Sequence, residues 1–268
     1  MKLSTLKKLV AASLIGAAFT AVTTAAHAED LLDQAKQRGT LRIGLEGTFP
    51  PFNSKASNGE LVGFDVDIAK AVATKMGLKP EFVTTKWSGI IASLQAGKFD
   101  AIVNQVGITD ARKQTLDFSP AYTYSYSNAQ LIQRKDDTRE FKSLKELKGK
   151  KLGVALGTNY MDMAKAVPGV DVKTYPGAPE YLRDLAAGRL DAALNDCLML
   201  AYLTKNSNLP LRPGANVGVG NPSGIPFKKG NPKFAKAIDD AMTQLEADGT
   251  FTKISNKWFG IDVTKPAK

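Results

Sequence analysis

The chain has 268 residues, with 36 lysines and arginines, 26 aspartates and glutamates, one histidine and one cysteine, and its formal net charge is +10. The basic residues are scattered rather than gathered into a tract interleaved with aromatic residues, so we expect no nucleic-acid partner. Because His27 lies in an N-terminal segment that we expect to be removed and Cys197 is the one cysteine, the remaining chain can form no internal disulfide, no metal site of histidine and cysteine ligands and no histidine-based catalytic triad.

The N-terminus has the order of features that is typical of a secretory signal peptide. Three lysines within the first eight residues precede an uncharged apolar stretch, Leu9 to Val22, which is followed by the small-x-small triplet Ala26-His27-Ala28. About 14 apolar residues are too few to span a bilayer, which takes about 20. We therefore predict export with cleavage after Ala28, which leaves a chain long enough for two domains of ordinary size. No cysteine near the cut offers an attachment point for a lipid.

The first part of the mature chain has the pattern of strands that alternate with helices. Thr40 to Leu45 reads as a strand that enters the turn Gly47-Thr48. A helix follows, with apolar side chains one turn apart on a single face: Phe64, Ile68, Val72 and Met76. A second helix is predicted from Ser88 to Gln95, for which Ser88 is a suitable N-cap residue. This alternation predicts a parallel sheet with helices on both faces.

Two segments that lie far apart in the chain are similar to each other. Residues 94–105 and 185–196 share the pattern L-x-A-G-[K/R]-x-D-A-x-x-N-[Q/D]. Each copy reads as a helix that ends at a glycine, then a short apolar strand, then polar residues at the carboxyl end of that strand. The polar residues are Asn104 and Gln105 in one copy and Asn195 and Asp196 in the other. The second copy is also preceded by a predicted strand that enters Gly157-Thr158, as the first is by one that enters Gly47-Thr48.

This duplication predicts an α/β fold with two lobes. Sheets of this kind bind ligands outside the carboxyl ends of their strands, so two facing lobes would bring the polar ends of both copies to one cleft. The tail of the chain carries apolar residues at helical spacing, namely Phe234, Ile238, Met242 and Leu245. We expect this helix to return to the first lobe.

A cation and an anion are predicted on opposite sides of the cleft. Thr109 is a suitable cap for a short helix that would place Arg112 at the mouth of the cleft, and a guanidinium matches the fork of a carboxylate. Asp196, from the other lobe, would supply the counter-charge for an ammonium group. The pair predicts a receptor for a zwitterion such as an α-amino acid. Two other interpretations stay open: Arg112 as an exposed helix arginine, and Asp196 as the N-cap of a helix over 197–202.

Aromatic residues beside the predicted turns are candidates for the walls of a side-chain pocket. These residues are Phe49, Phe52, Trp87 and Tyr160. Phe52 and Trp87 fit a hydrophobic core equally well. Glu46 ends the first predicted strand and would face either the cleft or the solvent.

Several short segments carry a resemblance to a known family: Leu45-Glu46-Gly47-Thr48-Phe49-Pro50-Pro51-Phe52, Gly63-Phe64-Asp65, Thr85-Lys86-Trp87, Asn104-Gln105-Val106, Asp110-Ala111-Arg112-Lys113, Gly157-Thr158-Asn159-Tyr160 and Lys257-Trp258-Phe259-Gly260. With these segments, the whole mature chain resembles the periplasmic polar-amino-acid-binding proteins of ABC importers. It is most similar to the branch that binds L-cystine.

The resemblance implies a periplasmic-binding-protein-like fold, in which two α/β lobes are joined by two hinge strands with a ligand cleft between them. Lobe 1 would comprise residues 29–124 and 221–268, and lobe 2 residues 125–220. The resemblance also implies a periplasmic monomer whose small-molecule ligand is an amino acid. Its partner would be a membrane-embedded ABC permease that recognises the closed form, and a chemoreceptor could read the same form.

The family's ligand site implies a role for individual residues. Arg112 would bind the α-carboxylate, with backbone donors at Gly107 and at Thr158-Asn159. Asp196 would take the α-amino group, with help from Gln105. The full set of predicted ligand-binding residues is Glu46, Phe49, Phe52, Trp87, Asn104, Gln105, Gly107, Arg112, Thr158, Asn159, Tyr160 and Asp196.

The side-chain pocket departs from the family's usual pattern. Phe49 and Trp87 would enclose the ligand side chain, and Glu46 would contact its far end. Phe49 stands where a tyrosine is usual, Gly107 where a serine or threonine is usual, and Cys197 where a larger or polar residue is common. These differences bear on which side chain is selected and leave Arg112 and Asp196 in place.

An enzyme is the alternative function. Some periplasmic proteins that resemble this family dehydrate cyclohexadienyl compounds such as arogenate, and such a reaction needs a proton donor beside the leaving group. Without a histidine, Glu46 or a lysine would have to serve, and nothing in the sequence marks either as activated. We therefore predict a binding protein with no catalytic residue, metal or cofactor.

Overall fold

A computed structural model describes residues 29–124 and 128–265. The predicted signal peptide, residues 1–28, lies outside the described residues, and so does residue 125, at which lobe 2 was expected to begin. Within the described part of the chain, no helix is both long and apolar enough to cross a membrane.

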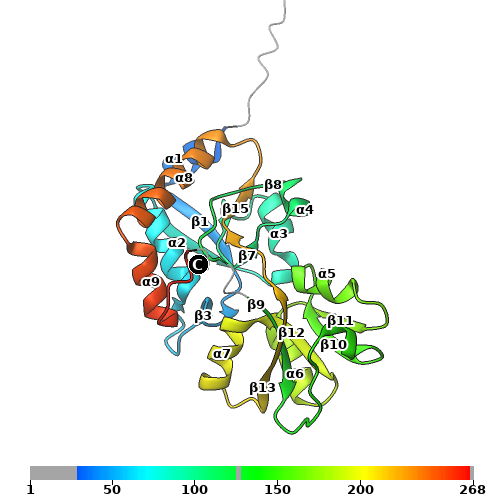
Figure 1. The fold of residues 1–268 in the computed structure, drawn as a ribbon. Helices are drawn as coiled ribbons and strands as arrows, with labels where there is room; N and C mark the ends of the chain where they lie inside the picture. Colours follow the sequence, from blue (N-terminus) through cyan, green and yellow to red (C-terminus); the bar gives the residue numbers. More distant parts are fainter. Residues whose placement is uncertain (1–28, 125–127, 266–268) are drawn as a thin grey trace, which may run out of the picture.

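The first of two five-stranded sheets has the strand order β5-β1-β6-β15-β8. Strands β5 and β6 run parallel to β1, whereas β15 runs antiparallel to both β6 and β8. The strands are β1 (Thr40–Leu45), β5 (Lys79–Thr84), β6 (Ala101–Ile102), β8 (Leu116–Phe118) and β15 (Pro226–Lys228). The helices of this half are α1 (Leu31–Arg38), α2 (Phe64–Lys75), α3 (Trp87–Gln95), α4 (Asp110–Lys113), α8 (Pro232–Ala247) and α9 (Thr250–Phe259). Figure 1 shows the tail helices, orange to red, on this half of the molecule.

The second sheet has the strand order β11-β10-β12-β9-β13. Strands β11 and β12 run parallel to β10, and β9 runs antiparallel to β12 and β13. The strands are β9 (Asn128–Arg134), β10 (Lys151–Ala155), β11 (Asp171–Tyr175), β12 (Ala192–Asp196) and β13 (Leu211–Val219). The helices are the 3-10 helix η1 (Leu144–Leu147), α5 (Asn159–Lys165), α6 (Ala178–Ala186) and α7 (Cys197–Asn206). The two sheets occupy separate halves of the molecule, which confirms the predicted two-lobed α/β fold (Figure 1).

The internal repeat extends into the packing of each sheet. A Cβ atom placed on Gly44 of β1 would lie 2.5 Å from the ring of Phe99, and one placed on Gly153 of β10 would lie 2.5 Å from Leu190. Phe99 and Leu190 occupy the same position in the two copies of the repeated segment. Each copy therefore needs a glycine where its first strand meets the large apolar side chain that precedes its next parallel strand.

The chain crosses between the lobes twice, and the two connections lie side by side. Beside the first lobe, β7 (Val106–Gly107) pairs with β14 (Ser223–Gly224), and an isolated bridge joins Thr123 to Ser223. The backbone N–H of Tyr122 donates to the carbonyl of Ser223 at 2.9 Å. Beside the second lobe, β9 and β13 form an antiparallel pair. A small sheet of β2 (Thr48–Phe49), β3 (Asn53–Lys55) and β4 (Leu61–Val62) follows β1.

Candidate functional site

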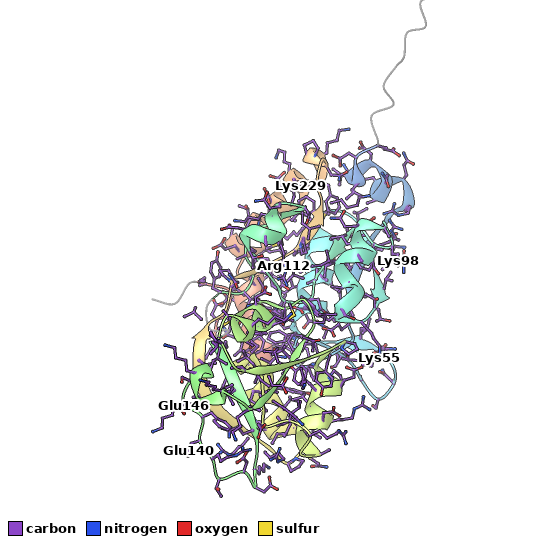
Figure 2. All side chains as sticks on the ribbon, turned by 90° about the vertical axis from the view of Figure 1, so that its right-hand side faces the viewer. Lys55, Lys98, Arg112, Glu140, Glu146 and Lys229 are labelled. Carbon is purple, nitrogen blue, oxygen red and sulfur yellow. The ribbon has the colours of Figure 1, made fainter. Side chains whose placement is uncertain are left out.

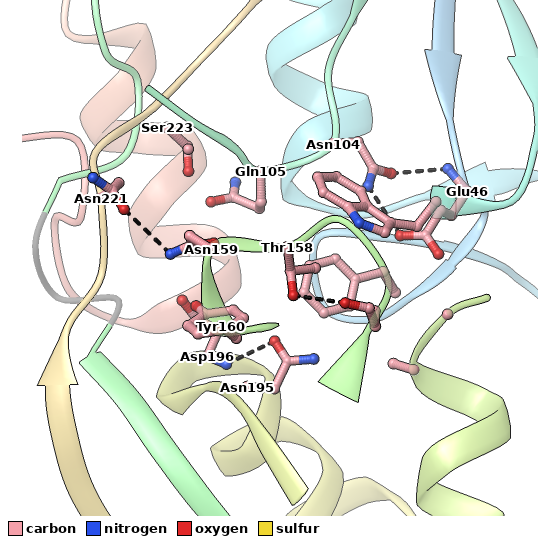
Figure 3. Close-up of a pocket in the computed structure, with 16 residues that line it drawn as sticks. Glu46, Asn104, Gln105, Thr158, Asn159, Tyr160, Asn195, Asp196, Asn221 and Ser223 are labelled. Carbon is pink, nitrogen blue, oxygen red and sulfur yellow. Dashed lines mark hydrogen bonds between the residues drawn. The ribbon is translucent and has the colours of Figure 1, made fainter. Parts of the chain in front are cut away.

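A cavity lies between the two lobes, at the carboxyl ends of β1, β6, β10 and β12. The space between the lobes measures about 580 Å³ when the part that opens to solvent is included. It is lined by Glu46, Phe49, Trp87, Asn104, Gln105, Gly107, Ala155, Thr158, Asn159, Tyr160, Gly177, Ala178, Asn195, Asp196, Asn221 and Ser223 (Figure 3). Both copies of the repeat thus contribute their polar strand ends to one space.

Direct contacts between the lobes surround this cavity. The backbone N–H of Ser88 donates to the carbonyl of Pro176 at 3.2 Å, and Lys86 lies 3.5 Å from Glu180. On another side, the side-chain amide of Asn159 donates to Asn221 at 3.3 Å, as the dashed line in Figure 3 shows. Polar groups on opposite lobes are therefore within hydrogen-bond distance, and the structure is that of a closed form.

A network of buried amides holds the cavity wall on the first lobe. The Asn104 carbonyl accepts from the backbone N–H of Glu46 at 2.8 Å and from the Asn53 amide at 2.9 Å, while its own amide donates to the Glu46 carboxylate at 3.0 Å. Asn53 in turn accepts from the backbone N–H of Gly47 at 2.8 Å. Asn104 is 1 % exposed and ties β1 to the end of β6, so its main contacts are with the wall itself.

Glu46 is the acidic group at one end of the cavity. Burial raises the pKa of its carboxyl to about 7, and hydrogen bonds from Asn104 and from the backbone N–H of Trp87 counter part of that rise. The negative charges of Glu180 and Asp65 add to it. The sequence left open whether Glu46 faces the cleft or the solvent, and in the structure Glu46 lines the cavity of the cleft.

Gln105 is unusual in its backbone conformation and in the hydrogen bonding of its side-chain amide. Its φ of 51° lies in the left-handed region, the one such value among non-glycine residues in the described part of the chain. Its backbone N–H donates to the Tyr122 hydroxyl at 3.1 Å, and its amide nitrogen donates to Asp65 at 2.7 Å. The Gln105 amide oxygen is buried and accepts no hydrogen bond from the described residues.

Asp196 brings an anion to the cavity from the second lobe. It is 5 % exposed and is the N-cap of α7, where its carboxylate accepts from the backbone N–H of Leu198 at 2.7 Å. Burial raises the pKa of the neighbouring Tyr160 hydroxyl well above its usual value, and the charge of Asp196 and a hydrogen bond to it raise that pKa further. Asp196 is therefore the N-cap of a helix, as one interpretation expected, and it also lines the cavity.

Arg112 lies at the edge of the cavity rather than in its lining. Thr109 caps α4 as predicted, by accepting from the backbone N–H of Arg112 at 3.2 Å. The guanidinium donates to the carbonyl of Gly107 at 2.8 Å and, across the cleft, to that of Gly157 at 3.0 Å. It also lies 5.5 Å from the centre of the Trp87 ring, and burial lowers its pKa. Arg112 is therefore half-buried and bridges the lobes, near the middle of the molecule in Figure 2.

Phe52 does not line the cavity, which corrects the prediction for this residue. Its side chain is fully buried and packs between the rings of Phe49, Phe64 and Phe259, with ring centres 4.9, 6.5 and 5.8 Å away. The tail helix α9 supplies Phe259, so Phe52 belongs to the core that holds the tail on the first lobe. Trp87, by contrast, is 9 % exposed and still lines the cavity.

The sequence interpretation missed several residues of this region. Ser223 and Asn221 lie on the second connection between the lobes and line the cavity. Gly177 and Ala178 reach it from the start of α6, where no motif marks them. Asp65 lies behind Gln105 and was noted in the segment Gly63-Phe64-Asp65, but without a role. Among the described residues, no cluster of His, Cys, Asp and Glu could hold a metal ion.

Comparisons with known proteins agree with this geometry. A family model described as bacterial extracellular solute-binding proteins, family 3, matches residues 41–261. The L-cystine-binding protein TcyJ of Escherichia coli (strain K12) is 43% identical over 238 residues, which cover 88% of this chain and 89% of that protein. A probable amino-acid ABC transporter-binding protein of Haemophilus influenzae is 33% identical, over 97% of this chain and 100% of that one.

Solved structures of amino-acid-binding proteins are also similar to this chain. An ancestral arginine-binding protein, solved with arginine and with glutamine bound, superimposes with a TM-score of 0.78 at 42% identity. The match covers 83% of this chain and 99% of that one. The relatives described above are named as binding proteins and not as enzymes.

Proposed function

The chain belongs to the bacterial extracellular solute-binding proteins of family 3, and from this premise we propose that it captures L-cystine between its lobes and delivers it to a membrane-embedded ABC permease. It is an amino-acid-binding protein rather than an enzyme. We also propose that it works as a periplasmic monomer, cleaved after Ala28, with residues 29–124 and 221–268 forming lobe 1 and residues 125–220 forming lobe 2.

The observation that carries the amino-acid assignment is the pairing of acceptors at one end of the cavity. Gln105, whose buried amide oxygen accepts no hydrogen bond from the described residues, comes from the first lobe, Asp196 comes from the second, and both residues line the same space. An ammonium group has three donors and a positive charge, so it matches this end. A ligand held by both lobes stabilises the closed form, which is the form that a permease would recognise.

We propose that Arg112 binds the α-carboxylate at the opposite edge. Its guanidinium already reaches across the cleft to Gly157, next to Thr158 and Asn159 in the cavity wall. A planar guanidinium can donate its remaining N–H groups to a carboxylate while it keeps a carbonyl partner. The ligand's charged head would then lie between Arg112 and Asp196, with its side chain directed towards Trp87, Phe49 and Glu46.

A second hollow at the Glu46 end supports cystine as the ligand. It shares Glu46 and Gly177 with the first cavity and is otherwise lined by Thr48, Thr84, Thr85, Lys86, Pro176, Pro179 and Glu180. Cystine carries an ammonium and a carboxylate at each of its two ends. Lys86 and Glu180 offer charges of both signs, 3.5 Å apart and from opposite lobes, for the second end. Arginine, whose far end is only cationic, would need Glu46 or Glu180 but not Lys86.

A ligand screen tests the assignment. The mature protein, unfolded and refolded to remove any bound ligand, is melted with L-cystine, L-arginine, L-glutamine and L-histidine. A true ligand at a hundred times its Kd adds about 2.7 kcal/mol to the free energy of unfolding, so the cognate amino acid should raise Tm clearly. Titration calorimetry then compares the wild type with Lys86→Ala, which should weaken cystine binding and leave arginine binding unchanged. A screen in which no amino acid raises Tm would contradict the proposal.

A further inference from the structure

Asp65 is a buried carboxylate without a cation. It is the second residue of α2, is fully buried, and takes part in no ion pair with the described residues. Instead it accepts three hydrogen bonds from neutral side chains: the Gln105 amide at 2.7 Å, the Tyr122 hydroxyl at 3.1 Å and the Asn53 amide at 3.1 Å. Burial of an unpaired charge is costly, and three neutral donors with the start of a helix offset only part of that cost.

These contacts fix the direction of the Gln105 side chain. Its amide nitrogen donates to Asp65 and also to the Thr123 hydroxyl at 3.2 Å, so both amide hydrogens have acceptors behind the cavity wall. An ionised carboxylate can only accept hydrogen bonds, so the amide cannot turn its oxygen towards Asp65. The oxygen must therefore face away from Asp65, where it is buried and has no donor, and Figure 3 shows Gln105 among the side chains around the cavity.

We propose that Asp65 is a positioning residue for ligand recognition: it holds the Gln105 amide with its oxygen towards the cavity, so that the site accepts an α-ammonium group. Asp65 does not touch the ligand and acts through Gln105. The inference rests on the proposed function, because it takes the ligand to be an amino acid. The inference adds Asp65 as the residue that keeps the amide oxygen of Gln105 available as a hydrogen-bond acceptor.

The same arrangement makes the site sensitive to protons. Burial raises the pKa of Asp65 to about 6, and the negative charge of Asp196 adds to the rise. The titratable groups that face Asp65 are Glu46 at the end of β1, Asp196 at the end of β12 and Tyr122 on the connection after β8. An ammonium group in the cavity would favour the ionised form of Asp65. Ligand binding near pH 6 should therefore release protons, and acidification below pH 6 should weaken binding because a protonated Asp65 can donate to a reversed Gln105 amide.

A double-mutant cycle tests whether Asp65 acts through Gln105. Each variant is titrated with L-cystine and with 3,3′-dithiodipropionic acid, which keeps both carboxylates and lacks both ammonium groups; L-arginine and 5-guanidinopentanoic acid form a second pair. Asp65→Asn and Gln105→Met should each weaken binding of the amino acid by about ten- to hundredfold. The double variant should lose little more than either single one. None of these variants should change the weak binding of the deaminated compound.

A matched control separates this role from a general effect of charge in the first turn of α2. Asp67 lies two residues after Asp65 in the same helix. It accepts hydrogen bonds from Lys257 and from the indole of Trp258. Asp67→Asn removes the same charge and should leave both affinities unchanged. Additive losses in the double variant, or an equal loss for the deaminated compound, would overturn the inference while wild-type binding still upheld the proposed function.

A second measurement needs no variant at Asp65, in case Asp65→Asn does not fold. Titration calorimetry of the wild type near pH 6, in buffers with different ionisation enthalpies, gives the number of protons released on binding. Release should persist in Glu46→Gln, because Asp65 is its source. No release in the wild type, or its loss in Glu46→Gln, would count against Asp65.

Discussion

The two copies of the repeat share a scaffold and differ at their ends. Each has a glycine on its first strand that leaves room for a large apolar side chain, Phe99 or Leu190. At the carboxyl end, the second copy presents a carboxylate directly, Asp196 at the start of α7. The first copy presents a neutral amide, Gln105. The nitrogen of this amide donates to the carboxylate of Asp65, which lies in α2 behind the cavity wall. The two equivalent strand ends therefore bring a carboxylate, and an amide that is backed by a carboxylate, to the same cavity.

The largest effect on affinity is expected when the carboxylate of Asp196 is replaced by an amide. Asp196→Asn keeps a good N-cap for α7, so the free energy of unfolding should change by less than about 1 kcal/mol. The affinity for the amino acid should fall by about 2–5 kcal/mol, because a buried partner of the ammonium is lost. Calorimetry and thermal melts measure the two quantities. If Gln105→Met costs as much as Asp196→Asn, the distinction between a direct and an indirect charge is wrong.

A smaller effect is expected where the copies are alike. Gly44→Ala and Gly153→Ala should each lower the free energy of unfolding by about 1–3 kcal/mol, because the new Cβ would lie 2.5 Å from Phe99 or Leu190. Gly89→Ala is the control, since a Cβ there meets no atom within 4 Å and the residue is helical. Denaturant unfolding measures all three. A large loss from one glycine and none from the other would show that the two scaffolds are not equivalent.

A separate prediction concerns Glu46 and pH. Its pKa is about 7 in the folded protein against an ordinary value of 4.5, so between these values the folded protein binds a proton that the unfolded chain has released. The free energy of unfolding should therefore fall as the pH rises through this window and stay lower above it. Glu46→Gln should flatten that decline and raise Tm at about pH 8, measured without ligand. A variant whose Tm declines with pH as steeply as that of the wild type would contradict this.

The sequence predicted the parts of the fold that depend on local pattern. The repeat predicted two lobes, and the strand ends at Gln105 and Asp196 do meet at one cavity. Thr109 caps α4 because its side chain needs only the residue three positions on. Phe52 was ambiguous for a physical reason: an aromatic residue after a turn packs on whatever the fold brings to it, and here α9, from the far end of the chain, brings Phe259.

The remaining contacts depend on where distant segments meet. An acid in the first turn of a helix, such as Asp65, is usually explained by the helix dipole. Its partners Tyr122 and Gln105 are separated from it by 57 and 40 residues, and no spacing rule connects them. The guanidinium of Arg112 finds Gly157 on the other lobe, so its position depends on closure rather than on the helix that carries it.

The place of β15 in the first sheet has a consequence for the order in which the chain can fold. The second sheet is made from one continuous stretch, β9 to β13, and needs no segment that follows residue 219. The first sheet has β15 between β6 and β8, so it stays divided until residues 226–228 arrive. The Asp30 carboxylate then accepts from the backbone of Lys233 and Phe234, which joins the beginning of the described chain to the helix α8. The lobe that is made first is thus completed last.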